Sequence, residues 1–473
     1  MPTSNRGPSP WLILGICCMS LLIVGIDGTI VNVALPAIRR ELHASLSGLQ
    51  WSIDAYTLVI ASFLMASGSM ADRFGRRRVF QIGLALFTLG SLLCSLATSI
   101  TALVVFRCLQ ALGGSMLNPV ALSIISNTFT ERQARARAMG IWGAVFGVSL
   151  ALGPVVGGVL VTYVTWRAIF WINIPIGVAA IVLTQLFVPE SKAPTARRFD
   201  PWGQLLVIVT LAMLTYGVIE GPDDGWGSAT IVSVFAIAAV AAVALAGVES
   251  RRREPLLEVR FFRSAPFSGA SLIAVLAFAV LGGFLFLNTL YLQDGRGYTA
   301  LHAGLLTLPM AAMICVFAPI SGRLVGSRGP RLPLVLAGFA IMAGAALLLR
   351  LSDGTSTAYL LGSYVVLGLG FGLVNAPISN TAVSGMPNSQ AGVAASVASA
   401  SRQTGSALGV AITGSIVAGT ANEGLASASH GAWALLTACG LAIAVLGYAS
   451  TGQRARATAQ RVSALFKEGE MSS

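Results

Sequence analysis

The chain has 473 residues, of which 55% are hydrophobic and only 10% are charged, and its mean hydropathy is +0.79. An ordinary soluble domain carries about 25% charged residues. A soluble protein this apolar could not cover its own surface, so we exclude the soluble classes and expect a membrane protein with many spans. The net charge is +12. In a membrane protein, the placement of the positive residues indicates first on which side of the bilayer each loop lies.

Apolar runs of roughly 20 residues, the length needed to cross a bilayer, recur along the whole chain. Charged or turn-forming residues separate them. We expect fourteen transmembrane helices, at approximately residues 11–34, 49–70, 79–98, 101–126, 138–161, 168–188, 203–220, 229–248, 266–290, 303–322, 332–350, 357–378, 392–418 and 431–450.

The 30 Lys and Arg residues are distributed unevenly between the two sides that this alternation defines. With the N-terminus inside, 23 of them fall in inside segments and 5 in outside segments, while Arg107 and Arg402 fall within spans. Because positive residues accumulate in cytoplasmic loops, both termini are predicted to be cytoplasmic. The basic charge is then a topology signal, and we expect no nucleic-acid partner.

The residue types that usually hold metals or nucleotides form no such pattern. The six cysteines lie in apolar segments without Cys-x-x-Cys or zinc spacing, and the three histidines are scattered. Neither Lys192 nor Lys467 stands in the Gly-Lys-Ser/Thr context of a phosphate-binding loop. We therefore expect no metal, no cofactor and no enzymatic activity.

An internal repeat divides the chain. GSMADRFGRRR follows the second predicted span and GRLVGSRGPR follows the tenth, so the glycines of the two copies match at an offset of 254. GGSMLNP in the fourth span and GFGLVNAP in the twelfth match at an offset of 257 to 258. Duplicated bundles with a site between them are typical of secondary transporters. We expect an all-α integral membrane fold, with six-helix bundles at 1–188 and 265–450, an inserted helix pair with linkers at 189–264, and a cytoplasmic tail at 451–473.

Four stretches resemble a single transporter family. GSMADRFGRRR is similar to the signature loop of the major facilitator superfamily, and GIDGTIVNVALPAI (25–38) resembles the first-helix motif of its 14-span drug:proton antiporters. RCLQALGGSMLNP (107–119) and GVSLALGPVVGG (147–158) resemble their fourth-helix and fifth-helix motifs. The resemblance covers the whole chain, and it implies export of drugs or antibiotics, driven by the proton gradient, across a bacterial inner membrane.

Three charged residues inside spans are candidates for proton coupling. Asp27 lies in the middle of the first span, where a charged carboxylate costs about 2.5–3.5 kcal/mol and burial favours the protonated form. Asp54, near the outer end of the second span, is a second proton or cation candidate. Arg107 must reach water, backbone carbonyls or a carboxylate. The resemblance implies a role for Arg107 in proton transfer, with Asp27 as its partner. Purely structural roles are the alternative.

Two further motifs carry expectations that come from the resemblance. It implies a cytoplasmic gate, in which Asp72 sits against a helix N-terminus of the other bundle. It also implies a tight helix seam that favours export over import. A topogenic basic loop and generic helix packing are the alternatives. The gate residues are Gly68, Asp72, Arg73, Gly75, Arg76 and Arg77, and the seam residues are Gly147, Gly153, Pro154, Gly157 and Gly158.

Aromatic and apolar groups usually line ligand pockets. Tyr56, Trp142, Phe146 and Tyr291 are candidates for such a lining, with lipid-facing or core packing as the alternative. Arg402 in the thirteenth span is a further candidate, for which structural and functional roles weigh equally. No acidic residue lies in a predicted span of the second bundle, so we expect neutral, zwitterionic or monocationic amphipathic substrates.

The favoured function is a proton-coupled antiporter that exports amphipathic compounds, acting as a monomer in the lipid bilayer. Asp27 would take a proton from outside as the drug leaves and release it inside as the next drug binds. The alternative is proton-coupled import of a small metabolite on the same fold. A non-transport membrane protein is a remote alternative, because the loops are too short for a catalytic or receptor domain.

Overall fold

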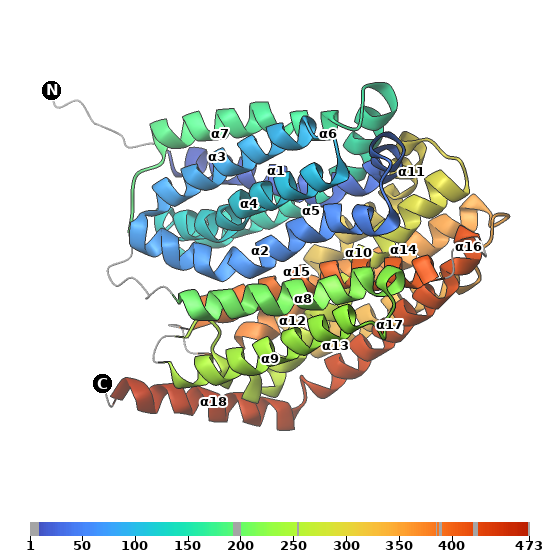
Figure 1. The fold of residues 1–473 in the computed structure, drawn as a ribbon. Helices are drawn as coiled ribbons and strands as arrows, with labels where there is room; N and C mark the ends of the chain where they lie inside the picture. The colour runs from blue at the N-terminus through green and yellow to red at the C-terminus, as the bar shows by residue number, and fades with distance from the viewer. Residues whose placement is uncertain are drawn as a thin grey trace.

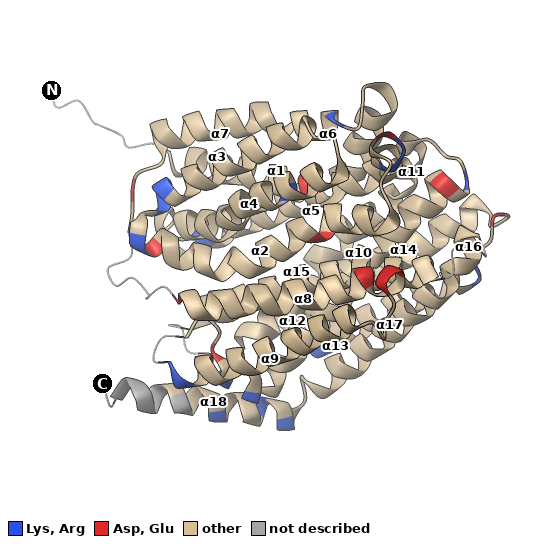
Figure 2. Ribbon diagram, in the orientation of Figure 1, with Lys and Arg blue, Asp and Glu red and all other residues tan. Residues whose placement is uncertain are grey.

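The computed structural model describes residues 9–192, 200–252, 255–384, 386, 390–419 and 424–471. Within these residues the chain is helical and has no β-strand. The long helices lie side by side, and most loops gather at two opposite ends (Figure 1). We call the end with the loops at 75, 129–131, 252–258 and 329–330 the basic end, because most Lys and Arg residues lie there (Figure 2). The opposite end is called the far end.

The first seven helices pack mainly with one another. α1 packs against α5, while α4 packs against both α2 and α3. Their bounds are α1 (Pro10–Leu42), α2 (Leu46–Phe74), α3 (Arg76–Ser95), α4 (Ile100–Thr128), α5 (Arg132–Tyr163), α6 (Ala168–Trp171) and α7 (Asn173–Phe187).

The next two helices, α8 (Pro201–Asp224) and α9 (Ala229–Arg251), pack against each other as a pair. The pair is attached to α2 by two hydrogen bonds. Gln204 Nε2 donates to the Ser62 carbonyl at 2.9 Å, and Trp51 Nε1 donates to Glu220 Oε1 at 2.6 Å. The pair is thus docked on the bundle through α8.

The remaining helices form a second group, in which α10 packs against α15, α13 against α17, and α12 against α14. Their bounds are η1 (Val259–Arg263), α10 (Ala265–Leu290), η2 (Tyr291–Gly295), α11 (Ala300–Leu306), α12 (Leu308–Arg328), α13 (Arg331–Leu347), η3 (Leu348–Arg350), α14 (Thr357–Val383), α15 (Ala391–Gly419), α16 (Leu425–Ala428), α17 (His430–Ala449) and α18 (Gln453–Met471).

The sequence analysis predicted only a cytoplasmic tail at 451–473, whereas most of this segment forms the helix α18. Ala455, Ala459, Val462 and Phe466 recur at helical spacing and are buried. The ring of Phe466 lies 5.6 Å from the ring of Phe261 in η1. These contacts fold the segment after the last span onto the basic end of the second group.

Thirteen helices among the described residues are long and apolar enough to cross a membrane, with α6 and α7 counted together and α11 and α12 likewise. The predicted span at 392–418 forms α15, which has the length but is not among the thirteen. Its sequence is rich in Ser, Gly and Thr and contains Arg402, which lowers its hydropathy. α2, α8 and α10 pack against it, so its polar groups lie between helices. The count of fourteen spans and the domain boundaries remain predictions.

The repeated loops share one backbone feature. Gly75 ends α2 with φ of 107°, and Gly329 ends α12 with φ of 80°. Such positive φ values strongly favour glycine. Glu190, whose carboxyl carbon lies 2.7 Å from the position of an added Gly75 Cβ, also accepts from the backbone N–H groups of Arg77 and Arg78 at 3.1 and 3.3 Å. Glu190 therefore caps the start of α3, where the helix dipole favours a carboxylate.

Apolar packing differs between the two ends of the molecule. Toward the far end one continuous core joins both groups of helices, with Ile30 and Phe170 of the first and Phe284 and Leu290 of the second. Toward the basic end the buried residues form two separate cores. One consists of residues from α1–α5 and α7 and the segment that follows, and the other mainly of residues from η1, α10, α14, α15 and α18, with Met65 of α2 beside it. This conformation is therefore closed at the far end.

Close packing between α1 and α5 requires glycine. A Cβ on Gly157 would lie 2.7 Å from Ile30 Cγ1, and one on Gly153 would overlap the Thr29 side chain. Both glycines come from the GPxxGG part of the fifth-helix motif. The two helices are thus in direct backbone-to-side-chain contact.

The next residue along that motif faces the second group of helices. A Cβ on Gly158 would lie 2.7 Å from Leu301 Cα, and Gly304 abuts the Pro154 carbonyl. The Leu301 N–H donates to Thr162 Oγ1 at 3.1 Å. α5 and α11 therefore form a tight seam that helps to close the far end.

We predict that Gly158→Val opens this seam, because overpacking of such a contact costs about 1–3 kcal/mol. In a cysteine-free background carrying Leu285→Cys, labelling by a membrane-impermeant maleimide from the far side should increase. Gly143→Val, in the same helix but with no neighbour within 4 Å of an added Cβ, is the control and should leave labelling unchanged. Equal labelling of both variants would contradict the role of the seam in closure.

Candidate functional site

Asp27 and Arg107 form a buried ion pair between α1 and α4. Arg107 Nη1 lies 2.5 Å from Asp27 Oδ2, and both side chains are shielded from solvent. The guanidinium is also satisfied by Gln110 Oε1, at 2.7 Å, and by the Ser52 carbonyl of α2, at 3.2 Å. The structure thus brings together the two residues that the sequence analysis paired. Their role in proton transfer stays a prediction.

The second oxygen of Asp27 is held by two amides that the sequence analysis did not name. Gln110 Nε2 and Asn173 Nδ2 donate to Asp27 Oδ1 at 2.8 and 3.1 Å. Asn173 also donates to Ser91 Oγ at 3.1 Å, and Ser91 donates to the Phe170 carbonyl. The available signal was that Gln110 follows Arg107 by three residues and so shares its helix face. The network therefore gives both oxygens of the carboxylate hydrogen-bond donors from three side chains.

Tyr56 belongs to this network. Its ring centroid lies 3.9 Å from the guanidinium carbon of Arg107, a cation–π contact. Its hydroxyl is buried without a hydrogen-bond partner. Tyr56, proposed from sequence as a cavity residue, instead covers the buried ion pair.

Asp54 is also a buried carboxyl group, but unlike Asp27 it has no hydrogen-bond partner among the described residues. It has no exposed surface, and neither of its carboxyl oxygens has a hydrogen-bond partner. Gln50, one turn earlier on α2, donates to the carbonyls of Val410 and Ala411 of α15 at 3.2 and 2.8 Å. Since residues four apart share a helix face, Asp54 lies on the side of α2 that meets the second group of helices. Burial without a partner favours its neutral, protonated form.

The hydrogen bonds of the predicted gate residues join the end of α2, the start of α3 and the segment after α7. Asp72 Oδ1 accepts from Arg76 Nη2 at 3.0 Å, within the same loop. Arg73 stacks over the ring of Phe74 at 5.7 Å, and Gly68 has open space beside it. The expected contact of Asp72 with a helix N-terminus of the other bundle is not formed, because the two cores are separate at the basic end. The gate function stays a prediction.

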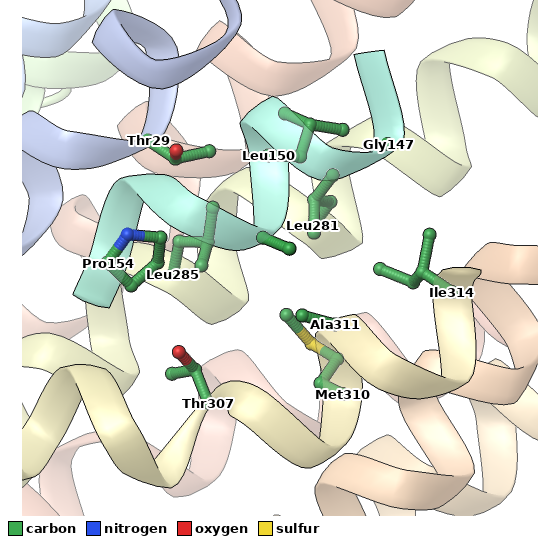
Figure 3. Close-up of a pocket in the computed structure, with 11 residues that line it drawn as sticks. Thr29, Gly147, Leu150, Pro154, Leu281, Leu285, Thr307, Met310, Ala311 and Ile314 are labelled. Atoms are coloured by element: carbon green, nitrogen blue, oxygen red, sulfur yellow. The ribbon is translucent and has the colours of Figure 1, made fainter. Parts of the chain in front are cut away.

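An apolar pocket lies between α1, α5, α10 and α12 (Figure 3). Its two hydroxyl groups, from Thr29 and Thr307, each bond to a carbonyl of their own helix, at 3.3 and 2.7 Å. The pocket therefore offers aliphatic surface and little free polarity. Its lining residues are Thr29, Gly147, Leu150, Ala151, Pro154, Leu281, Leu285, Thr307, Met310, Ala311 and Ile314.

None of the predicted aromatic cavity residues lines this pocket. Trp142 packs partly against the core of the first group, and Phe146 is half-buried on the same helix. Tyr291 is a core residue whose hydroxyl donates to the Ser352 carbonyl at 2.7 Å. Gly147 and Pro154, predicted as seam residues, do line the pocket. Among the described residues, no group of His, Cys, Asp and Glu side chains could hold a metal ion.

Comparison with solved structures agrees with this architecture. The chain superposes on a D-xylose–proton symporter with a TM-score of 0.68, 14% identity and coverage of 93% of this chain and 97% of that one. It superposes on a POT family transporter in complex with a thioalcohol-conjugated peptide with a TM-score of 0.66, 17% identity and coverage of 94% and 96%. At these identities the likeness concerns the fold alone.

Comparison with characterised sequences is more specific. The chain is 39% identical to the multidrug resistance protein Stp of Mycobacterium tuberculosis, over 85% of this chain and 74% of the relative. It is 36% identical to the tetracenomycin C resistance and export protein of Streptomyces glaucescens, over 88% and 78%. The multidrug efflux pump LfrA of Mycolicibacterium smegmatis is 34% identical, over 88% and 82%. The profile of the Major Facilitator Superfamily matches residues 17–410. This multi-pass membrane protein therefore belongs to the Major Facilitator Superfamily and is a transporter, not an enzyme.

Proposed function

We propose that this transporter is a proton-driven antiporter that exports amphipathic compounds of the drug or antibiotic kind. The observation that carries the proposal is the buried Asp27–Arg107 pair, a titratable centre inside an apolar bundle. Intramembrane ionisable groups of this kind mark proton relays and ion pathways. The efflux and resistance functions named for the relatives support the direction of transport.

The geometry supports a coupling route through α1. Protonation of Asp27 would remove the charge that balances Arg107, leaving the cation with Gln110, the Ser52 carbonyl and the Tyr56 ring. Thr29, two residues further along α1, lines the pocket. A change in how α1 is held at Asp27 would therefore act on the wall of the substrate pocket. Protonation and substrate binding would compete through one helix rather than through direct contact.

Asp54 is proposed as the second proton site. In this conformation Asp27 is surrounded by donors and Asp54 by none. The two buried carboxyl groups therefore differ in their hydrogen-bond partners within the same structure. Since Asp54 lies on the face of α2 that meets α15, its proton would be exchanged when that interface rearranges.

The proposed orientation places the basic end and both termini in the cytoplasm of a bacterial inner membrane, with the protein as a monomer. The conformation, closed at the far end, would then be closed toward the outside. Import by symport, the alternative from sequence, gains no support from the superpositions on the D-xylose–proton symporter and the POT family transporter, which show only the fold. No cofactor is proposed, since the proton gradient supplies the energy.

We predict that Asp27→Asn abolishes proton-driven uptake of a fluorescent dye into acid-inside everted vesicles while dye binding to the purified protein persists. Asparagine keeps the shape but cannot exchange a proton. The variant should also lose about 3–5 kcal/mol of stability, because Arg107 becomes an uncompensated buried charge. Thermal unfolding measures this second effect.

The double variant Asp27→Asn/Arg107→Gln separates coupling from folding. Removing both charges should recover most of the lost stability, yet uptake should stay absent. Uptake against the gradient by either variant would place the coupling group elsewhere, and wild-type vesicles that move no dye would remove the multidrug part of the proposal.

We predict that Asp54→Asn changes stability by less than about 1 kcal/mol at neutral pH, since it replaces a neutral, unpartnered carboxyl group by a group of similar shape. Its transport should lose part of its pH dependence. Thermal unfolding from pH 5 to 8 and dye uptake at several lumenal pH values provide the measurements. A drop in stability as large as that of Asp27→Asn would show that Asp54 is ionised and paired.

A further inference from the structure

We propose that Arg402 of α15 is the recognition site for an anionic group of the exported compound. The proposal rests on the proposed export function and extends it to substrate chemistry. Arg402 Nη2 lies 3.3 Å from Ser379 Oγ of α14, and Nη1 lies 3.5 Å from the Ala398 carbonyl of its own helix. Among the described residues, these two long contacts are the polar contacts of the guanidinium.

Arg402 lacks most of the polar partners that surround Arg107. Arg107 has a carboxylate, a side-chain amide, a backbone carbonyl and an aromatic ring around it. Among the described residues Arg402 has no carboxylate partner, and from α10 to α17 the described acidic residues are Asp294 and Asp353, in the segments at the far end. A guanidinium carries five donors in a planar fork that matches a carboxylate, phosphate or sulfonate. Arg402 uses two of these donors, in long hydrogen bonds of 3.3 and 3.5 Å.

The surroundings of Arg402 suit a ligand. Arg402 is partly buried and Ser379 is exposed, so the site can be reached from water. Asn375 precedes Ser379 by one turn on the same face of α14, and its side-chain oxygen is buried with no hydrogen-bond partner. The site thus combines a free cation with an unused acceptor. This pairing fits an anionic group that has a hydroxyl or amine beside it.

The site lies close to the level of the apolar pocket. Ser406, one turn after Arg402 on α15, packs with its backbone oxygen 2.5 Å from where a Cβ on Gly282 would lie. Leu281, the neighbour of Gly282, lines the pocket. An amphipathic compound could therefore place an aliphatic or aromatic body in the pocket region and an acidic group at Arg402. Acidic or zwitterionic amphipathic compounds are favoured, and monocations, which the sequence analysis had included, are disfavoured at this site.

A matched pair of dyes tests this inference. Rhodamine B carries a free carboxylate, and its ethyl ester has the same xanthene body without it. We expect the purified wild-type protein to bind rhodamine B about tenfold more tightly than the ester, because only the acid can form a charge-assisted hydrogen bond with Arg402. Quenching of tryptophan fluorescence measures both affinities. Arg402→Gln should reduce this ratio to about one, and Arg402→Lys should retain part of it. Arg350→Gln, which removes a positive charge from the far end, should keep the full ratio.

Stability supplies a readout that separates a ligand site from a structural arginine. The thermal midpoint of unliganded Arg402→Gln should equal or exceed that of the wild type, while the stabilisation by rhodamine B is lost. A lower midpoint without dye, or equal affinity of the wild type for acid and ester, would overturn the inference but leave export intact. Selective binding of the acid without proton-driven uptake would instead overturn the proposed export function. Binding of neither dye would overturn the anion site.

Discussion

The buried Asp27–Arg107 pair is the constraint on which the first group of helices depends. Two opposite charges 2.5 Å apart in an apolar bundle are tolerated only if their remaining hydrogen-bonding capacity is met. Gln110, Asn173 and the Ser52 carbonyl meet it, and they come from α4, α7 and α2. One charge pair therefore fixes the relative positions of four helices.

α5 connects this charged centre to the other half of the molecule. Gly153 and Gly157 hold it against α1, and Gly158 holds it against α11. Because a glycine contact leaves no flexible side chain to absorb movement, a shift of α1 is passed on to the seam. The GPxxGG motif thus links the helix that carries Asp27 to the closed end of the molecule.

The sequence predicted site residues best where a charged residue lies in an otherwise apolar span. A lone arginine in an apolar span predicted a need for water, backbone carbonyls or a carboxylate, and the family resemblance implied Asp27 as its partner. Amides gave a weaker signal, so Gln110 and Asn173 were missed, and the capping role of Glu190 was not predicted. α15 differs from the other predicted spans because Ser, Gly and Thr are acceptable where neighbouring helices cover them. The aliphatic pocket could not be derived, since it is formed by helices far apart in the chain.

The glycines that end α2 and α12 both have positive φ, yet the two copies differ in their centres. At the offset that matches Asn118 to Asn375, the counterpart of Arg107 is Tyr364, whose ring packs 5.2 Å from that of Phe284. An aromatic contact carries no net charge. The two halves therefore share the turn that ends a helix but differ in the electrostatics of their centres, so the repeat is symmetric in backbone and asymmetric in charge.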